Sequence, residues 1–162
     1  MDLRNDLSFF HLLTESYRRL IGKSLTPEGI TTEEAVGWLY AEAPFATLAH
    51  NTAPDPIFIY GNKAAQQRFE YTWEELTALP SRLSAEAPER SDRQQFLERV
   101  ARDGFVTGYS GIRIAKSGKR FRIQNATVWQ LTDADGTYRG QAAILPQTID
   151  VETTEGLEHI SN

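Results

Sequence analysis

The sequence predicts an α+β protein: a five-stranded antiparallel sheet with short helices over one face and an N-terminal helical extension over the other. The main observation is that residues 105–145 contain three runs rich in β-branched and aromatic residues, separated by turn residues at 116–119 and 132–136. Short connections join antiparallel neighbours, so these runs predict a three-strand meander. The second observation is that helical patterns upstream can cover the sheet. The meander strands are expected at Tyr109–Ala115, Arg120–Leu131 and Tyr138–Leu145.

Residues 6–21 predict the first helix, because apolar residues recur at helical spacing from Phe9 onward, between an N-cap at Asn5 or Asp6 and a closing Gly22. The apolar stripe of this helix must be buried. We expect the stripe to pack on this chain's own sheet. The alternative is the seam of a dimer, because an N-terminal amphipathic helix is available to partners.

A second helix is predicted after Thr31, which together with Glu34 forms a capping box. It must end before Pro44, since the residue before a proline disfavours helical backbone. The two helices make up the predicted N-terminal extension, residues 1–44.

Two strands are predicted next, at Phe45–His50 and Ile57–Tyr60, on either side of a proline-containing turn. Three short helices follow, with start signals at Asn62, at a capping box beginning with Thr72 and at another beginning with Ser91. The predicted main domain then spans residues 45–147, and an acidic, polar stretch predicts a loose tail at 148–162. The three helices are expected at Lys63–Phe69, at 73–79 and at Asp92–Asp103, with an irregular segment at 80–90.

This order of elements is that of the PAS fold. The stretches that carry the resemblance are the strand-to-helix step FIYGNKAAQQRFEYTWEEL and the turns AKSGKRF and DADGTYRGQAAI. Over roughly residues 9–145 the sequence more closely resembles the MEKHLA domain family, a PAS-like group. The segments that carry this second resemblance are FFHLLTESYRRLIGKSL, WLYAEAPFATLAHNTAPDPIFIYGNKAAQQRFEYTWEEL, LPSRLSAEAPER and YSGIRIAKSGKRFRIQNATVWQLTDADGTYRGQAA.

The resemblance implies a sensory or regulatory module whose ligand and signal are largely undefined for the family. Members occur as free-standing small proteins in photosynthetic microbes and at the end of plant transcription factors of the homeodomain-leucine-zipper class. Neither the homeodomain nor the zipper is found in this sequence, so no DNA-binding role is implied. We expect a module with no output domain of its own, which acts through a partner protein or through self-association.

Composition limits the partners and the chemistry. A net charge of -5 argues against nucleic acid. The apolar runs are far shorter than the roughly 20 residues that span a bilayer, and the first residues lack a signal-peptide pattern, so we expect a cytoplasmic location and no membrane partner. The chain has no cysteine, which rules out disulfides, thiolate metal sites and cysteine nucleophiles.

Two cofactors of PAS domains can be tested against the residues. The cysteinyl-flavin adduct is excluded because the chain has no cysteine, whereas non-covalent flavin binding stays open. Haem is not expected, because the predicted helix Asp92–Asp103 contains no His, and His11 and His50 lie elsewhere.

Neither a metal site nor a catalytic group is predicted. The stretch Asp133–Gly136 resembles the start of a calcium loop but lacks the remaining ligands, so a hairpin turn is expected. No serine lies in a Gly-x-Ser-x-Gly elbow, and no carboxylates form a signature for acid/base chemistry. We therefore expect no enzyme activity.

The register of the first meander hairpin decides which polar residues face the expected pocket. A simple two-residue turn would pair Ile114 with Phe121 and place Arg113 on the opposite face. A bulged turn would place Arg113 opposite Ile123, facing the same way. The matching turn of flavin PAS domains suggests the bulged form. We favour the simple turn slightly because it gives a clean apolar face, and the sequence leaves open whether Arg113 faces the pocket or the N-terminal helix.

In either register we expect Phe121, Ile123, Asn125 and also Trp129 to share a face. A buried asparagine needs hydrogen-bond partners, which we expect to be backbone or another side chain, with a ligand as the alternative. Arg82 is expected to tie its loop to Glu86 or another acid rather than to contact a ligand. The candidate ligand-binding residues are Phe58, Asn62, Phe69, Trp73, Arg82, Tyr109, Arg113, Phe121, Ile123, Asn125, Trp129 and Gln141.

Three hypotheses about function follow. The first is a PAS-like sensory module that binds a small molecule and signals through its N-terminal helix or a partner surface. The second is a ligand-free interaction or dimerisation module with a filled core. The third is an enzyme on an NTF2-like fold, for which His50 and Asp55 are the one nearby Asp–His pair.

Overall fold

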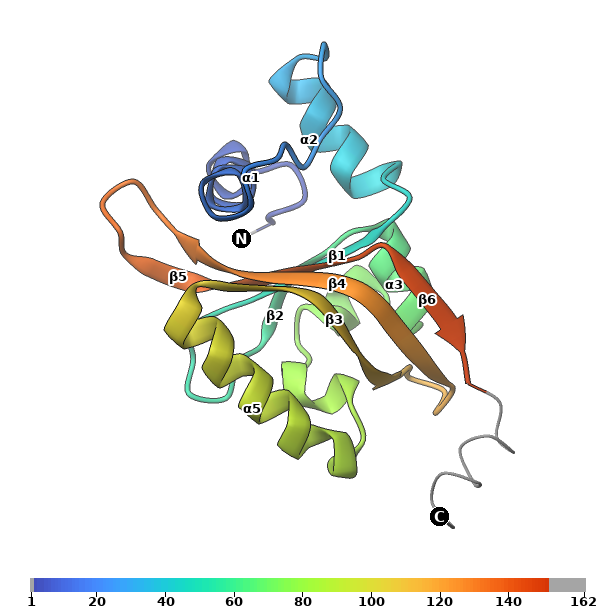
Figure 1. Cartoon of the computed structure of the whole chain (residues 1–162). Coiled ribbons are helices and arrows are strands. Elements are labelled where there is room, and N and C mark those ends of the chain that lie inside the picture. Colours follow the sequence, from blue (N-terminus) through green and yellow to red (C-terminus); the bar gives the residue numbers. More distant parts are fainter. Residues whose placement is uncertain (1, 152–162) are drawn as a thin grey trace.

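The computed structural model describes residues 2–151, without the side chains of residues 87–93. Its middle layer is an antiparallel sheet in the order β2-β1-β5-β4-β3, with β6 paired to β4. Helices α1 and α2 lie on one side of the sheet, and α3 and α5 on the other (Figure 1). The strands are β1 (Ala46–His50), β2 (Phe58–Gly61), β3 (Phe105–Ile114), β4 (Arg120–Thr132), β5 (Tyr138–Leu145) and β6 (Gln147–Asp150). The helices are α1 (Leu7–Ile21), α2 (Thr32–Ala41), α3 (Lys63–Phe69), α4 (Trp73–Leu76), the short 3₁₀ helix η1 (Ser81–Ser84) and α5 (Ala87–Asp103).

The predicted fold class is confirmed, with five main antiparallel strands and the short β6 added to them. The local start signals act as the sequence predicts. Asp6 caps α1 by accepting from the Phe9 amide, and Thr31 and Thr72 form complete capping boxes with the glutamates three residues on. Among the described residues, no helix is both long and apolar enough to cross a lipid bilayer.

The capping box predicted at Ser91 is wrong. Helix α5 begins at Ala87, four residues earlier, after an N-cap at Glu86, and Ser91 lies inside it. Pro88 in the first turn is the stronger start signal, because proline loses no intrahelical hydrogen bond there and its φ is already helical. The capping-box pattern at 91–94 is therefore an interior sequence of the helix.

The predicted start of the C-terminal tail, at residue 148, is also wrong, because a strand covers the first residues of that segment. Residues 147–150 form β6, in which Thr148 pairs with Ile123 and Asp150 with Phe121 of β4. The carboxylate of Asp150 pairs with Arg68 of α3 at 2.6 Å and with Lys119 at 3.1 Å. The polar composition of this segment gives no sign of a strand, because the strand forms only by pairing with β4.

The apolar stripe of α1 packs on the outer face of this chain's own sheet, as expected. Tyr17 meets Trp129 of β4 with ring centroids 4.8 Å apart, and the Trp129 indole N–H donates to the Leu13 carbonyl at 3.3 Å. The Ser16 hydroxyl donates to the Thr132 carbonyl at 2.9 Å and accepts from the Thr132 amide at 3.0 Å. These contacts fix α1 on β4 and leave its polar side outward.

One glycine is required by a close approach of two strands. Gly140 in β5 has φ +137°, and a Cβ built there would lie 2.1 Å from the His50 carbonyl oxygen of β1. The backbone of β1 cannot shift to make room for a methyl group as easily as the end of a flexible side chain could.

We therefore expect Gly140→Ala to lower the free energy of unfolding by more than about 1 kcal/mol. The matched control is Gly37→Ala, in the exposed part of α2 with nothing near its added methyl. That change should raise the stability by up to about 1 kcal/mol, because alanine favours helix over glycine. Urea denaturation of both variants measures the effect, and equal shifts would contradict it.

Candidate ligand-binding site

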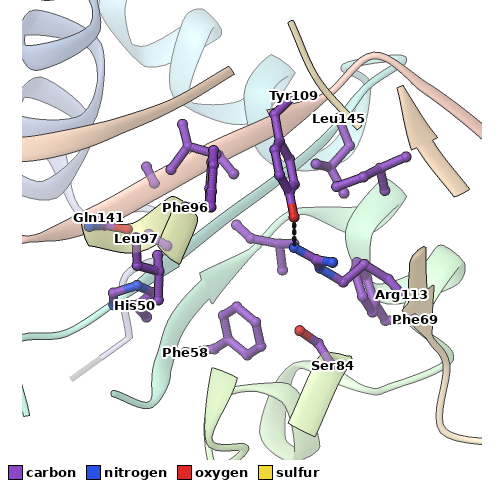
Figure 2. Close-up of a pocket in the computed structure, with 16 residues that line it drawn as sticks. His50, Phe58, Phe69, Ser84, Phe96, Leu97, Tyr109, Arg113, Gln141 and Leu145 are labelled. Atoms are coloured by element: carbon purple, nitrogen blue, oxygen red, sulfur yellow. Dashed lines mark hydrogen bonds between the residues drawn. The ribbon is translucent and has the colours of Figure 1, made fainter. Parts of the chain in front are cut away.

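A cavity of about 70 Å³ lies between the inner face of the sheet and the helices α3, η1 and α5. We call this space the cup. The sheet supplies residues from β1 to β5, and α3, η1 and α5 close it from the other side (Figures 1 and 2). The lining residues are Leu48, Ala49, His50, Phe58, Phe69, Ser84, Phe96, Leu97, Tyr109, Arg113, Ile123, Val128, Gln141, Ala142, Ala143 and Leu145.

Most of the wall is apolar and aromatic. Phe96 of α5 stacks on Tyr109 of β3 with ring centroids 3.8 Å apart and planes inclined by 26°. Phe58 comes from β2, beside η1, which is held there by the Ser81 amide donating to the Pro56 carbonyl at 2.8 Å. The elements that form the wall are thus joined by backbone contacts as well as by side chains.

Arg113 is the charged group of the cup. Its side chain is 7 % exposed, and it lies in the cavity wall. Its Nη1 donates to the Ile112 carbonyl at 2.8 Å, and its Nη2 donates to the Tyr109 hydroxyl at 3.1 Å (Figure 2). No Asp or Glu is among the lining residues that the structure describes.

The opposite side of the cup is also polar. Gln141 of β5 is 5 % exposed, and its Oε1 is buried without a hydrogen-bond partner among the described residues. Gln141 lies with His50 and Leu97 on the side away from Arg113 (Figure 2). His50 Nδ1 is 2.9 Å from the Asn51 carbonyl oxygen. The cup therefore has an apolar middle and a polar group at each end.

The hairpin register decides that Arg113 faces the cup. Arg113 pairs with Phe121 and Ile114 with Arg120, so the simple turn, which pairs Ile114 with Phe121, is wrong. The loop instead has three residues, closed by the Ala115 amide donating to the Lys119 carbonyl at 2.8 Å, with Gly118 at φ +94°. In this turn geometry a left-handed third residue is the usual choice. Arg113 shares a face with Ile123, as the alternative predicted, although its partner is Phe121.

The expectation that Trp129 shares a face with Phe121 is wrong. Asn125 adopts the left-handed region with φ 55°, and the pairing of β3 with β4 slips between Gly111/Ile123 and Tyr109/Ala126. One extra residue on β4 reverses the alternation of its side chains beyond that point. Val128 therefore lines the cup, and Trp129 turns toward α1.

Asn125 itself is exposed, and its amide donates to Gln147 Oε1 at 3.4 Å. The expected position of Asn125 on the buried face with Phe121 and Ile123 is therefore wrong, because it sits in the bulge, although its partner is another side chain, as expected. Arg82 pairs with Asp55 at 3.1 Å in an exposed position, so it does tie its loop to an acid. Asp55 therefore has Arg82 as an ion-pair partner and lies outside the lining of the cup.

Asn62 serves the fold and does not line the cup. It is fully buried, and its side chain makes four hydrogen bonds. Oδ1 accepts from the Thr47 and Ala65 amides at 2.9 and 3.0 Å, and Nδ2 donates to the Leu39 and Phe45 carbonyls at 3.0 Å each. These bonds use its full capacity as donor and acceptor.

Half of the sequence-predicted site residues line the cup: Phe58, Phe69, Tyr109, Arg113, Ile123 and Gln141. The other predicted residues lie outside the lining. Trp73 packs against Tyr60 and Tyr40 on the other side, and Phe121 is buried against Phe69 with ring centroids 5.0 Å apart. Asn62, Arg82, Asn125 and Trp129 have the contacts described above.

Several lining residues were missed, and two patterns would have found them. Period-two alternation from Gln141 along β5 leads directly to Ala143 and Leu145. The inward positions of the helix before the meander include Phe96 and Leu97. Ser84 has no comparable signal, because it comes from the irregular 3₁₀ segment.

Charged groups near the hairpin loop between β3 and β4 pair with one another outside the lining of the cup. The hairpin loop between β3 and β4 rests on α3, with the Lys116 amide donating to the Phe69 carbonyl at 3.0 Å. A hydrogen bond from the Lys116 ammonium holds the pKa of Glu75 below its usual value. Hydrogen bonds from Ser117 likewise lower the pKa of Glu70. These carboxylates are therefore ionised at neutral pH and face outward.

A flavin does not fit the cup in this structure. The cavity of about 70 Å³ is well below the roughly 300 Å³ or more of typical pockets for drug-sized ligands. The size of the cup favours a much smaller ligand.

The same sheet and helices occur in PAS domains of known structure. The PAS domain of a protein from Colwellia psychrerythraea is similar with a TM-score of 0.55 at 16% identity, covering 69% of this chain and 90% of that one. A light-oxygen-voltage domain studied with a flavin analogue gives a TM-score of 0.54 at 14% identity, covering 72% and 84%. An RNA-binding light-oxygen-voltage receptor gives 0.62 at 19% identity, over 86% of this chain and 40% of the receptor. The protein thus has a PAS-like fold.

The MEKHLA domain family matches residues 7–149, so this chain belongs to that family. The match confirms the resemblance seen in the sequence and extends it from residues 9–145 to residues 7–149, into β6. No curated protein is similar enough to this chain to count as a match.

Substitution of the two candidate asparagines should change stability by very different amounts. Asn62→Ala leaves two amides and two carbonyls buried without their partner, so we expect it to cost roughly 3 kcal/mol or more of the free energy of unfolding. Asn125→Gly keeps the left-handed bulge with a residue that adopts it freely, so stability should change by less than about 1 kcal/mol. Urea denaturation measures both changes, and a small loss of stability in the Asn62→Ala variant would contradict the structural role assigned to Asn62.

Proposed function

We propose that this protein is a non-catalytic, PAS-like sensory or regulatory module that binds a small molecule in the cup and passes its occupancy to a partner protein. The observation that carries the proposal is a mostly apolar cavity with two buried polar side chains, Arg113 and Gln141, whose hydrogen-bonding capacity is not fully used within the described chain. Concave apolar sites with a few convergent polar groups are the usual form of a ligand pocket. Membership of the MEKHLA family supports a sensory or regulatory role.

The sheet offers a route for the signal. Adjacent residues of β4 face opposite sides, with Val128 in the cup and Trp129 against Tyr17 of α1. On β5, Gln141 lines the cup while Ile144 packs with the α1 layer. A shift of β4 or β5 on ligand binding would therefore reach α1 through direct contacts. We propose the exposed side of α1 as the surface that reports this shift to a partner.

A homodimer through α1 stays a prediction. The apolar side of the helix, including Phe9, Phe10 and Leu13, is buried within this chain. A dimer would have to use the outer side, where His11 and Glu15 lie 3.7 Å apart. Native mass spectrometry across concentration would decide its stoichiometry.

A cavity-filling variant tests ligand binding. Ala143 lines the cup, and Ala143→Leu should occupy part of the cavity at a cost of about 1–3 kcal/mol in stability at most. We expect native mass spectrometry of the purified wild-type protein to show a retained compound, or thermal-shift screening to find one, and the variant to lose it. The control Ala101→Leu lies on the exposed side of α5 and should bind as the wild type does.

Two outcomes would contradict the proposal. One is that no compound is retained and no ligand class shifts the melting temperature of the wild-type protein. The other is that a compound binds equally well to Ala143→Leu, which would place its site outside the cup. Amide hydrogen exchange with and without the compound then tests the route, since α1 should change its protection when the cup is filled.

A further inference from the structure

Arg113 is a buried cation with no acidic partner among the side chains that the structure describes. Its side chain is 7 % exposed, and no ion pair joins it to a carboxylate among the described residues. Three other arginines on the elements around the cup form ion pairs with carboxylates, and Arg113 does not. The paired arginines are Arg68 with Asp150, Arg82 with Asp55 and Arg120 with Glu86.

The hydrogen bonds of Arg113 also leave capacity unused. A guanidinium has five N–H groups, and two of them donate, to the Ile112 carbonyl and the Tyr109 hydroxyl. Both acceptors are neutral, and the Tyr109 ring, whose centroid lies 5.5 Å from the guanidinium carbon, adds a cation–π contact, so these groups supply no counter-charge. Burying an unpaired charge is costly, and the cost is offset only when a counter-charge reaches it.

We propose that the cup binds a small organic anion whose carboxylate pairs with the Arg113 guanidinium. This inference rests on the proposed function and names its ligand class. The planar, forked guanidinium matches a carboxylate, to which it donates two parallel hydrogen bonds. The Tyr109 hydroxyl, already bonded to Arg113, lies beside that position and holds the guanidinium in place.

The rest of the cup determines the body of the ligand. Phe58 and Phe96 form apolar walls between the two polar ends, and Leu97 lies at the end with Gln141. At the far end, the buried Gln141 Oε1 is an acceptor without a donor. A ligand with a hydroxyl or amino group opposite its carboxylate satisfies both ends, and a cavity of about 70 Å³ limits it to a few heavy atoms.

The lining favours a carboxylate over inorganic phosphate. Arg113 is the one Lys or Arg among the lining side chains that the structure describes, and the wall is mostly apolar. A doubly charged phosphate would need further cations or amide donors to replace its hydration. A monoanion with an apolar body needs only one arginine for its charge and an apolar lining for its body.

The experiment compares each acid with its own amide. Propionate, lactate, 3-hydroxypropionate and benzoate are titrated into the full chain by calorimetry, beside propionamide, lactamide, 3-hydroxypropionamide, benzamide and inorganic phosphate, at constant ionic strength set with sodium chloride. We expect at least one carboxylate to bind, its amide to bind about tenfold or more weakly, and phosphate not to bind. A terminal hydroxyl should improve binding over propionate, and Gln141→Leu should remove that gain.

Variants assign the effect to Arg113. Arg113→Met keeps most of the side-chain volume without the charge and should weaken carboxylate binding about tenfold or more, whereas Arg113→Lys should keep part of it. Arg122→Met, on β4 beside the pairing partner of Arg113 but outside the lining, should bind as the wild type does. The ligand-free Arg113→Met variant should need more urea to unfold than the wild type, because a buried unpaired charge is removed. This result also shows that the variant folds.

The outcomes separate this inference from the proposed function. If an uncharged compound binds in an Ala143-dependent way and no carboxylate does, the anion assignment is overturned and the sensory proposal stands. If acids and amides bind alike, or Arg113→Met binds carboxylates as the wild type does, the assignment is also overturned. If no compound of any class binds the wild-type protein, both proposals fail together.

Discussion

The buried side chain of Asn62 holds the layers of this protein in register. Its four hydrogen bonds reach the carbonyl of Leu39 in α2, the carbonyl of Phe45 before β1, the amide of Thr47 in β1 and the amide of Ala65 in α3. Helix α2, strand β1 and helix α3 are thus joined by the side-chain amide of one residue. A buried polar side chain is tolerated only when its partners are all present, so the alternative packings that would break this set are strongly disfavoured.

The cup depends on a second constraint, the irregular pairing of β3 with β4. A sheet covered on both faces needs apolar residues on both sides of every central strand. The bulge at Asn125 lets β4 send Ile123 and Val128 into the cup and Trp129 to α1. The three-residue hairpin turns Arg113 inward. A charge enters a mostly apolar face because of backbone geometry, and this local conflict with stability is typical of a functional position.

Local sequence signals were reliable where a short-range interaction decides the structure. The caps at Asp6, Thr31, Asn62 and Thr72 act over three residues, and all four are formed. The prediction failed at Ser91, where the same pattern lies inside α5 because the helix begins at an earlier signal, and at 147–150, where a polar stretch becomes a strand by pairing with β4. A local sequence pattern shows that a segment can begin a helix or form a strand. It does not show which of several helix starts is used, or with which strand the segment pairs.

The sequence by itself determined the fold class, the family, every helix start but that of α5, and the absence of cysteine chemistry, because these depend on composition, spacing and contacts within a few residues. Only the tertiary structure decided the direction of Arg113, the separation of Phe121 from Trp129 and the membership of the cup. A shift of one residue in strand pairing moves every side chain beyond it to the other face. Such a shift depends on turn geometry and on the packing of both faces at once, and no single stretch of sequence contains that information.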